Sequence, residues 1–165
     1  MTERVTFVVG DLVFEQTHNQ LGLFDHVMSN PPFFERGSGQ LPKNKARALA
    51  TIESTADLSL WIDFMIGALR DNGTITLIHR AEREDEIIDL LRPRCGNVGI
   101  MDLPSKQDDG MQKLIIIQAI KGADGTGVTR KELILHNAND GFTEEALAIL
   151  RDAQHAPISS SQKTG

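Results

Sequence analysis

Short runs of β-branched and aromatic residues alternate along this chain with segments whose apolar residues recur at helical spacing. This alternation is the strongest constraint on the fold, because consecutive parallel strands need a helix to carry the chain back across the sheet. It predicts a doubly wound α/β sheet. We expect strands at residues 4–9, 24–29, 74–79, 98–103, 113–120 and 132–136. We expect helices from residue 58 to just before Asn72-Gly73, at 81–91 and at 143–151.

The late strands refine this pattern. Residues 113–120 (KLIIIQAI) are almost continuously apolar, which predicts a central strand covered on both faces. The stretch 122–127 (GADGTG) is a flexible connection to the expected strand at 132–136 (ELILH). Two strands joined by a loop without a helix predict an antiparallel edge at the C-terminal side of the sheet.

Length and composition restrict the class of protein. A chain of 165 residues with 40% hydrophobic residues predicts one globular domain, over residues 1–155, followed by a polar, disordered tail at 156–165. No apolar run approaches the roughly 18 residues of a membrane span, and no signal-like stretch follows the polar start. The single cysteine, Cys95, forms no internal disulfide. We therefore expect a cytoplasmic protein that is neither secreted nor bound to a membrane.

The most informative motif is Asn30-Pro31-Pro32-Phe33, directly after the strand expected at 24–29. Open α/β sheets bind their ligands at this end of their strands. Two prolines fix an extended turn without N–H donors, which leaves the Pro31 carbonyl as an acceptor beside the Asn30 amide oxygen. Two adjacent acceptors suit a planar NH2 group, and Phe33 can stack on the ring that carries it. The alternative is that the motif only ends a strand and that Phe33 belongs to the core.

The stretch FDHVMSNPPFFERGSG resembles motif IV of the amino-directed methyltransferases that use S-adenosylmethionine. The resemblance extends to LSLWID, NGTITLIHRA, KLIIIQAIKG and LILHNANDGFTEEALAILR, and it covers residues 4–152. Together these segments are similar to the tRNA1(Val) adenine N6-methyltransferase family. The motif alone is shared with DNA adenine, rRNA guanine-N2 and release-factor glutamine methyltransferases.

This resemblance implies roles for individual residues. Asn30 and Pro31 would hold the target amine, Pro32 would fix the turn, and Phe33 would stack on the base. Asp11, with its neighbour Leu12, resembles the cofactor-binding position that accepts from the adenine amine of S-adenosylmethionine. An ordinary turn acid is the alternative for Asp11.

The resemblance also implies an incomplete sheet. Enzymes of this type begin with a strand, a glycine-rich cofactor turn and a later acid for the ribose, and none of these precedes Arg4. We therefore expect an incomplete doubly wound, Rossmann-like class I methyltransferase sheet, similar to the C-terminal two-thirds of such an enzyme. Glycines 37, 39, 125 and 127 lie in turns outside a strand-to-helix context.

A short basic segment follows the motif. Residues 35–47 contain four basic side chains and one acid, although the whole chain has a net charge of −6. We expect these basic residues to contact an RNA backbone, with a solvated loop as the alternative. They are Arg36, Lys43, Lys45 and Arg47.

The sequence leaves three functions open. The first is N6-methylation of an adenine in the anticodon loop of tRNA, with S-adenosylmethionine as the cofactor. The second keeps this chemistry but acts on a guanine N2 amine or a glutamine amide. The third is a binding module, or remnant, without catalysis. The five histidines and Asp108-Asp109 show no metal-ligand spacing, so we expect no metal.

Overall fold

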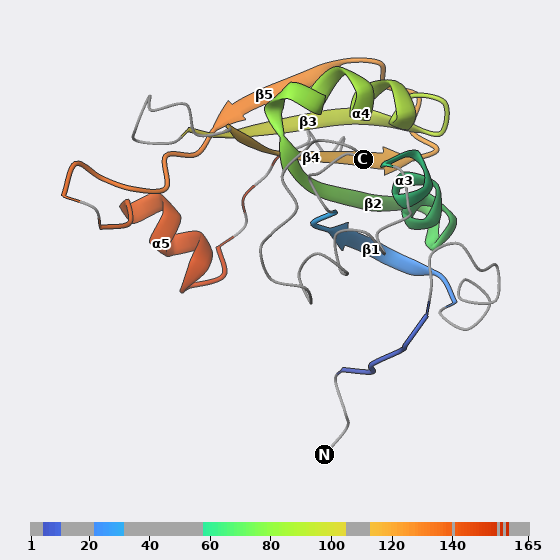
Figure 1. Cartoon of the computed structure of the whole chain (residues 1–165), viewed down its shortest axis with the longest axis horizontal. Helices are drawn as coiled ribbons and strands as arrows, with labels where there is room; N and C mark the ends of the chain where they lie inside the picture. Colours follow the sequence, from blue (N-terminus) through green and yellow to red (C-terminus); the bar gives the residue numbers. More distant parts are fainter. Residues whose placement is uncertain are drawn as a thin grey trace, which may run out of the picture.

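The structure of this chain is a computed structural model that describes residues 5–10, 22–31, 58–104, 113–139, 141–154, 156 and 158. It forms a mixed α/β fold around one five-stranded sheet (Figure 1). The elements in chain order are β1 (Phe24–Ser29), α3 (Leu58–Gly67), β2 (Leu69–Arg80), the 3₁₀ turn η1 (Ala81–Arg83), α4 (Glu84–Leu91), β3 (Cys95–Leu103), β4 (Leu114–Lys121), β5 (Val128–Glu132) and α5 (Glu144–Leu150).

The strand order in the sheet is β1-β2-β4-β3-β5. β1 pairs with β2 in parallel, and β5 pairs with β3 in parallel. β4 lies between β2 and β3 and runs antiparallel to both. The predicted α/β class and a central strand at 113–120 are confirmed. The antiparallel strand is inserted inside the sheet, and the edge strand β5 is parallel to its neighbour, which differs from the expected antiparallel edge.

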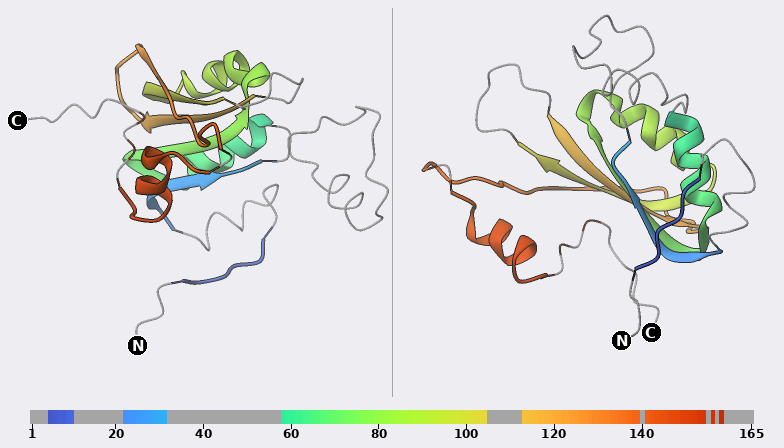
Figure 2. Two further views of the ribbon diagram at one scale, coloured as in Figure 1. Left: turned by 90° about the vertical axis from the view of Figure 1, so that its left-hand side faces the viewer. Right: turned by 60° about the horizontal axis from the view of Figure 1, so that its bottom comes forward.

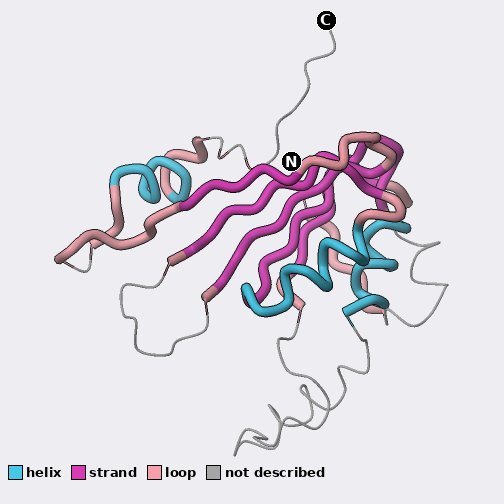
Figure 3. The backbone as a smooth tube through the Cα atoms, turned by 90° about the horizontal axis from the view of Figure 1, so that it is seen from above, coloured by secondary structure: helices cyan, strands magenta, loops and turns pink. Residues whose placement is uncertain are grey.

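The main core lies between one face of the sheet and the helices α3 and α4. Both helices cover this face, and they contact each other (Figure 3). Alternate residues of the strands point into the core, as the period of two in a β-strand requires. The fully buried members include Ile62, Leu69, Ile75, Leu77, Ile87, Leu91, Ile100, Ile115 and Ile117.

The opposite face of the sheet is covered less completely. A second cluster joins Met101, Leu133 and Ile158, with Ile116 and Ile149 packed against it. α5 supplies Ile149 and stands apart from α3 and α4 (Figure 2). β4 therefore buries only one of its two faces, whereas its apolar sequence predicted burial of both. Of the expected tail, the described residues 156 and 158 pack in this cluster.

The first helix ends earlier than its apolar spacing predicts. α3 stops at Gly67 and Leu69 already belongs to β2, where it pairs with Phe24. The register then shifts, since the next pair in the ladder is His26 with Thr74. Asn72 adopts a positive φ of 64° inside this irregularity. A Cβ at Gly73 would lie 2.9 Å from a backbone oxygen, so the bulge requires glycine there.

Two expected strands differ in the structure. Residues 5–10 pair with no described strand, and Phe7 and Val9 are 93% and 98% exposed. A β-branched run alone does not make a strand, because a strand needs a hydrogen-bonded neighbour. The expected strand at 132–136 is displaced to β5, where Val128 pairs with Val98. Burial of Leu133 in the second cluster takes the following residues out of the ladder.

The structure also describes the single cysteine and the length of the helices. Cys95 is a free, buried thiol, and its burial raises its pKa. Among the described helices, none combines the length and apolar character needed to cross a membrane.

Candidate functional site

The parallel strands β1, β2, β3 and β5 all end on the same side of the sheet. Asn30 and Pro31 follow β1 there, one and two residues beyond the pair of Ser29 with Leu77. We call this side the carboxyl end of the sheet. Open α/β sheets place their ligands at this end, because loops rather than covering helices meet there. The expected motif therefore begins at the position where a ligand site is favoured.

The alternation along β1 separates the side chains around the motif. Val27 and Ser29 are half-buried, and Val27 packs against the main core, whereas Met28 is 81% exposed. Asn30 continues the exposed series, and Pro31 is buried. Since side chains two residues apart share a face of a strand, Asn30 lies on the side of β1 away from α3 and α4. Asn30 is therefore accessible to a ligand, whereas the adjacent Pro31 is buried.

The neighbouring strand contributes a buried histidine. His79 is 1% exposed and lies on β2, two residues after the partner of Ser29. Burial lowers the pKa of His79, and the positive charge of Arg83 lowers it further. His79 is therefore neutral at pH 7. It shares the face of β2 with Ile75 and Leu77, which pack under α3 and α4, so it lies on the opposite face of the sheet from Asn30.

The other expected site residues lie outside the described residues. They are Pro32 and Phe33 of the motif, the cofactor-binding pair Asp11 and Leu12, and the basic residues Arg36, Lys43, Lys45 and Arg47. The structure thus brings Asn30 and Pro31 to the carboxyl end and gives no geometry for the rest. Within the described part of the chain, no group of three or more histidine, cysteine, aspartate or glutamate side chains is arranged to hold a metal ion.

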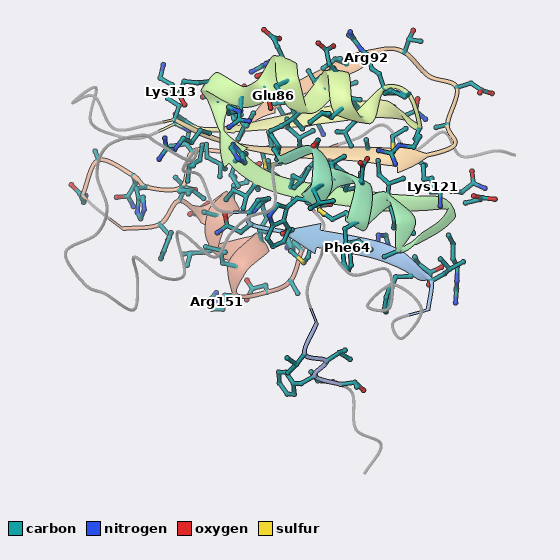
Figure 4. The ribbon with its side chains drawn as sticks, turned by 45° about the vertical axis from the view of Figure 1, so that its right-hand side comes forward. Phe64, Glu86, Arg92, Lys113, Lys121 and Arg151 are labelled. Carbon is teal, nitrogen blue, oxygen red and sulfur yellow. The ribbon has the colours of Figure 1, made fainter. Side chains whose placement is uncertain are left out.

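Two features at this end were missed by the sequence reasoning. Because β4 is antiparallel to its neighbours, its first residues meet the carboxyl ends of the other strands, and the Lys113 carbonyl accepts from the Ala81 N–H at 2.8 Å. Lys113 is exposed, and Figure 4 shows it on the opposite side of the molecule from Lys121. The hairpin after β5 also reaches this end, with His136 stacked on Phe142. These features could not be predicted because they depend on the direction of each strand in the sheet, which the composition of a strand does not encode.

Comparisons with known proteins identify the relatives of this chain. The model of the N-6 DNA methylase family matches residues 2–147. A tRNA1(Val) (adenine(37)-N6)-methyltransferase of Actinobacillus succinogenes is 25% identical over 129 residues, which are 78% of this chain and 52% of the relative. The enzyme of the same name from Actinobacillus pleuropneumoniae is 23% identical over 144 residues, 87% of this chain and 57% of the relative. The chain therefore spans about half the length of these curated relatives.

A solved structure shares the fold. The crystal structure of a predicted O-methyltransferase from Agrobacterium tumefaciens superposes with a TM-score of 0.59 at 22% identity. The match covers 84% of this chain and 58% of the other. At this identity the likeness shows a shared fold and nothing finer.

Proposed function

Because this chain belongs to the N-6 DNA methylase family, we propose that it acts in the transfer of a methyl group from S-adenosylmethionine to the N6 amine of an adenine, and that this adenine lies in tRNA. The single observation that carries the proposal is the exposed Asn30, followed by the buried Pro31, at the carboxyl end of β1. An amide oxygen at a ligand-binding edge, next to a proline turn, is the acceptor that an aromatic amine requires.

The chain's own residues orient the amine. The Asn30 side-chain oxygen and the Pro31 carbonyl each accept one N–H of the adenine amine. The nitrogen lone pair then turns out of conjugation with the ring and toward the methyl donor. Phe33 stacks on the base and fixes its plane. Pro32 has no N–H and a restricted φ, so it would limit the backbone freedom of the residue that carries the second acceptor.

When bound, S-adenosylmethionine would supply a methyl group on a sulfonium, with S-adenosylhomocysteine as the leaving group and loss of one proton from the N6 amine to solvent. The chain's residues would therefore orient the amine and would not act as the nucleophile. We assign the acceptor side of this site to Asn30 and Pro31 and the cofactor side to Asp11 and Leu12. Asp11 would accept from the adenine amine of the cofactor. The positioning of two reactants in line accounts for the rate gain in such a site.

The preference for tRNA rests on two observations. The relatives from both Actinobacillus species carry a tRNA1(Val) name, at 23–25% identity. Four basic residues, Arg36, Lys43, Lys45 and Arg47, follow the motif and suit a phosphate backbone. An adenine in an anticodon loop is unpaired, so turning it out of its strand costs little.

The test is methyl transfer by the full chain from labelled S-adenosylmethionine to four substrates presented separately. These are unmodified tRNA, rRNA, adenine-containing DNA and a release-factor glutamine peptide. Digestion and mass spectrometry identify the labelled group. The proposal predicts N6-methyladenosine in tRNA. Label on adenine in DNA would support the proposed N6-adenine methylation but would contradict tRNA as the substrate.

The remaining outcomes decide between the other functions. Label on guanine N2 or on glutamine overturns the adenine assignment. Titration of the same preparation with S-adenosylmethionine separates catalysis from binding. A folded chain that neither binds the cofactor nor labels a substrate overturns the proposal in favour of a module without catalysis.

A further inference from the structure

The hairpin that joins β5 to α5 carries an aromatic pair in solvent. His136 and Phe142 form an antiparallel bridge, and their rings stack with centroids 4.8 Å apart at an interplanar angle of 25°. His136 is exposed, and Phe142 is 45% exposed. A stacked pair in a core is ordinary packing, but this pair leaves much of its aromatic surface open to a ligand.

The hairpin is held by its own hydrogen bonds. The Asn137 side-chain oxygen accepts the backbone N–H of Asn139 at 2.9 Å and that of Gly141 at 3.2 Å. Its amide nitrogen donates to the Phe142 carbonyl at 3.3 Å. The backbone N–H of Asn137 donates to the Gly141 carbonyl at 2.8 Å. These bonds fix the separation of the two strands of the hairpin, so the aromatic pair is preorganised.

The hairpin is also fastened to the sheet. The Leu133 N–H donates to the carbonyl of Asp102 on β3 at 2.9 Å, and the Leu133 side chain is buried in the second cluster. The Thr143 hydroxyl donates to the Ile134 carbonyl at 2.7 Å and accepts the Ala146 N–H at 3.1 Å, which caps α5. The pair therefore has a defined position relative to the sheet.

That position is at the carboxyl end. β5 is parallel to β3, which runs in the same direction as β1, so the hairpin follows β5 on the side where Asn30 follows β1. Figure 1 shows the arrowheads of β1 and β5 pointing toward the side where the hairpin and α5 lie. The aromatic pair and the candidate amine site thus share one end of the sheet. They follow its two edge strands, β5 and β1, and β3, β4 and β2 lie between them.

The charged side chains next to the pair indicate which part of a nucleic acid the pair can bind. Glu144 and Glu145 are exposed and begin α5 directly after the hairpin. Two carboxylates repel phosphate, so this surface does not favour a sugar-phosphate backbone. A neutral base with an open face meets no such penalty, and aromatic side chains bind unpaired bases by stacking.

We propose that the His136–Phe142 pair is a stacking platform for an unpaired base of the nucleic-acid substrate that lies several nucleotides from the methylated adenine. This inference rests on the proposed function, because the stacked base belongs to the same single-stranded segment that presents the adenine to Asn30. The pair binds this base by stacking on its open face rather than by binding phosphate.

The test uses the full chain and a short single-stranded RNA that carries 2-aminopurine, whose fluorescence falls when it stacks. The variant Phe142→Leu removes the ring and keeps an apolar side chain. It is expected to weaken RNA binding by about tenfold, within the range for loss of one stacked base, and to remove most of the quenching. The dependence of affinity on salt stays as in the wild type, because the substitution removes no group that binds phosphate.

The matched control is Phe24→Leu, because Phe24 is 40% exposed at the start of β1, at the other end of the sheet. This control is expected to bind and quench like the wild type. If Phe142→Leu impairs folding, Phe142→Trp decides, since a larger ring retains or increases affinity on a stacking platform. Loss of binding in a folded Phe142→Trp chain overturns the proposal.

Two other results also overturn the proposal. One is wild-type affinity and quenching in a folded Phe142→Leu chain, which leaves the pair as an interaction within the hairpin. The other is absence of quenching by the wild-type chain. Methyl transfer is measured separately, so failure of the platform and failure of the proposed function are distinguished.

Discussion

The face of the sheet under α3 and α4 and the carboxyl end that carries Asn30 are held in different ways. The first is closed by side chains with almost no exposure, such as Ile62, Ile115 and Ile117. At the carboxyl end, Asn30 follows β1, an edge strand whose one described neighbour is β2. The side chain of Met28 on β1 is exposed. Packing stabilises the first region, whereas accessible polar groups and aromatic rings characterise the second.

This difference assigns separate roles to the two regions. Buried apolar area dominates the free energy of folding, so the covered face determines whether the chain folds. Ligand sites belong to less protected parts of a structure, because a ligand must replace solvent there. Substitutions in the two regions are therefore expected to change different measured quantities.

The largest expected effect is on stability in the covered face. Ile117→Ala is expected to lower the free energy of unfolding by about 2–5 kcal/mol, since Ile117 is 1% exposed and its truncation leaves a cavity. Met28→Ala is expected to change it by about 0.5 kcal/mol or less. Denaturant unfolding of the two variants provides the measurement. Equal losses at the two positions would remove the distinction between the regions.

The second effect concerns binding and leaves stability unchanged. Replacing Arg36, Lys43, Lys45 and Arg47 by serine is expected to flatten the salt dependence of tRNA binding. Each basic side chain that binds a phosphate contributes about one unit to the slope of log affinity against log salt, so its removal lowers the slope by that amount. Filter binding at several salt concentrations measures this slope, and the melting temperature is expected to stay constant.

The control for the basic segment is a chain with Arg70→Ser and Arg92→Ser. Both arginines are exposed and form ion pairs, with Asp25 and Asp89 respectively. They lie away from the carboxyl end, so their replacement is expected to leave the slope near the wild-type value. An unchanged slope in the four-residue variant would identify residues 35–47 as a solvated loop.

The smallest effect is a dependence of stability on pH in the covered face. The pKa of His79 is lowered in the folded chain, so the unfolded chain binds a proton more readily. The contribution to stability is complete above the ordinary pKa of 6.5 and falls as the pH is lowered below it. His79→Gln is expected to flatten this part of the curve. A wild-type curve that matches that of His79→Gln would contradict the assignment.

The sequence predicted those parts of the fold that local patterns determine. The strands at 24–29, 98–103 and 113–120 and the helix at 81–91 lie within a few residues of β1, β3, β4 and η1 with α4. The early end of α3 was not predictable, because Leu69 fits a helical stripe and a strand equally well. Its pairing with Phe24 decides between them, and pairing is not a local property.

Strand pairing also explains other differences between the predicted and the observed elements. Residues 5–10 have strand composition, yet no described strand pairs with them. β5 is set by its register with β3, which places the polar sequence VTRKE in the sheet and the apolar Leu133 in the second cluster. At the candidate site, the sequence predicted that Asn30 and Pro31 follow a strand, as they do in the structure. The stacking of His136 on Phe142 could not be predicted, because it depends on a hairpin held by the Asn137 amide.

The central claim is that Asn30 positions an amine at the carboxyl end of β1, and one comparison tests it directly. Methyl transfer to tRNA is measured for the wild type, for Asn30→Ala and for Asn72→Gly, an exposed control in which glycine suits the positive φ of 64°. The account predicts that Asn30→Ala lowers turnover by about 10²-fold or more with an unchanged melting temperature, while the control stays near wild type. Near-complete methylation by Asn30→Ala would contradict it.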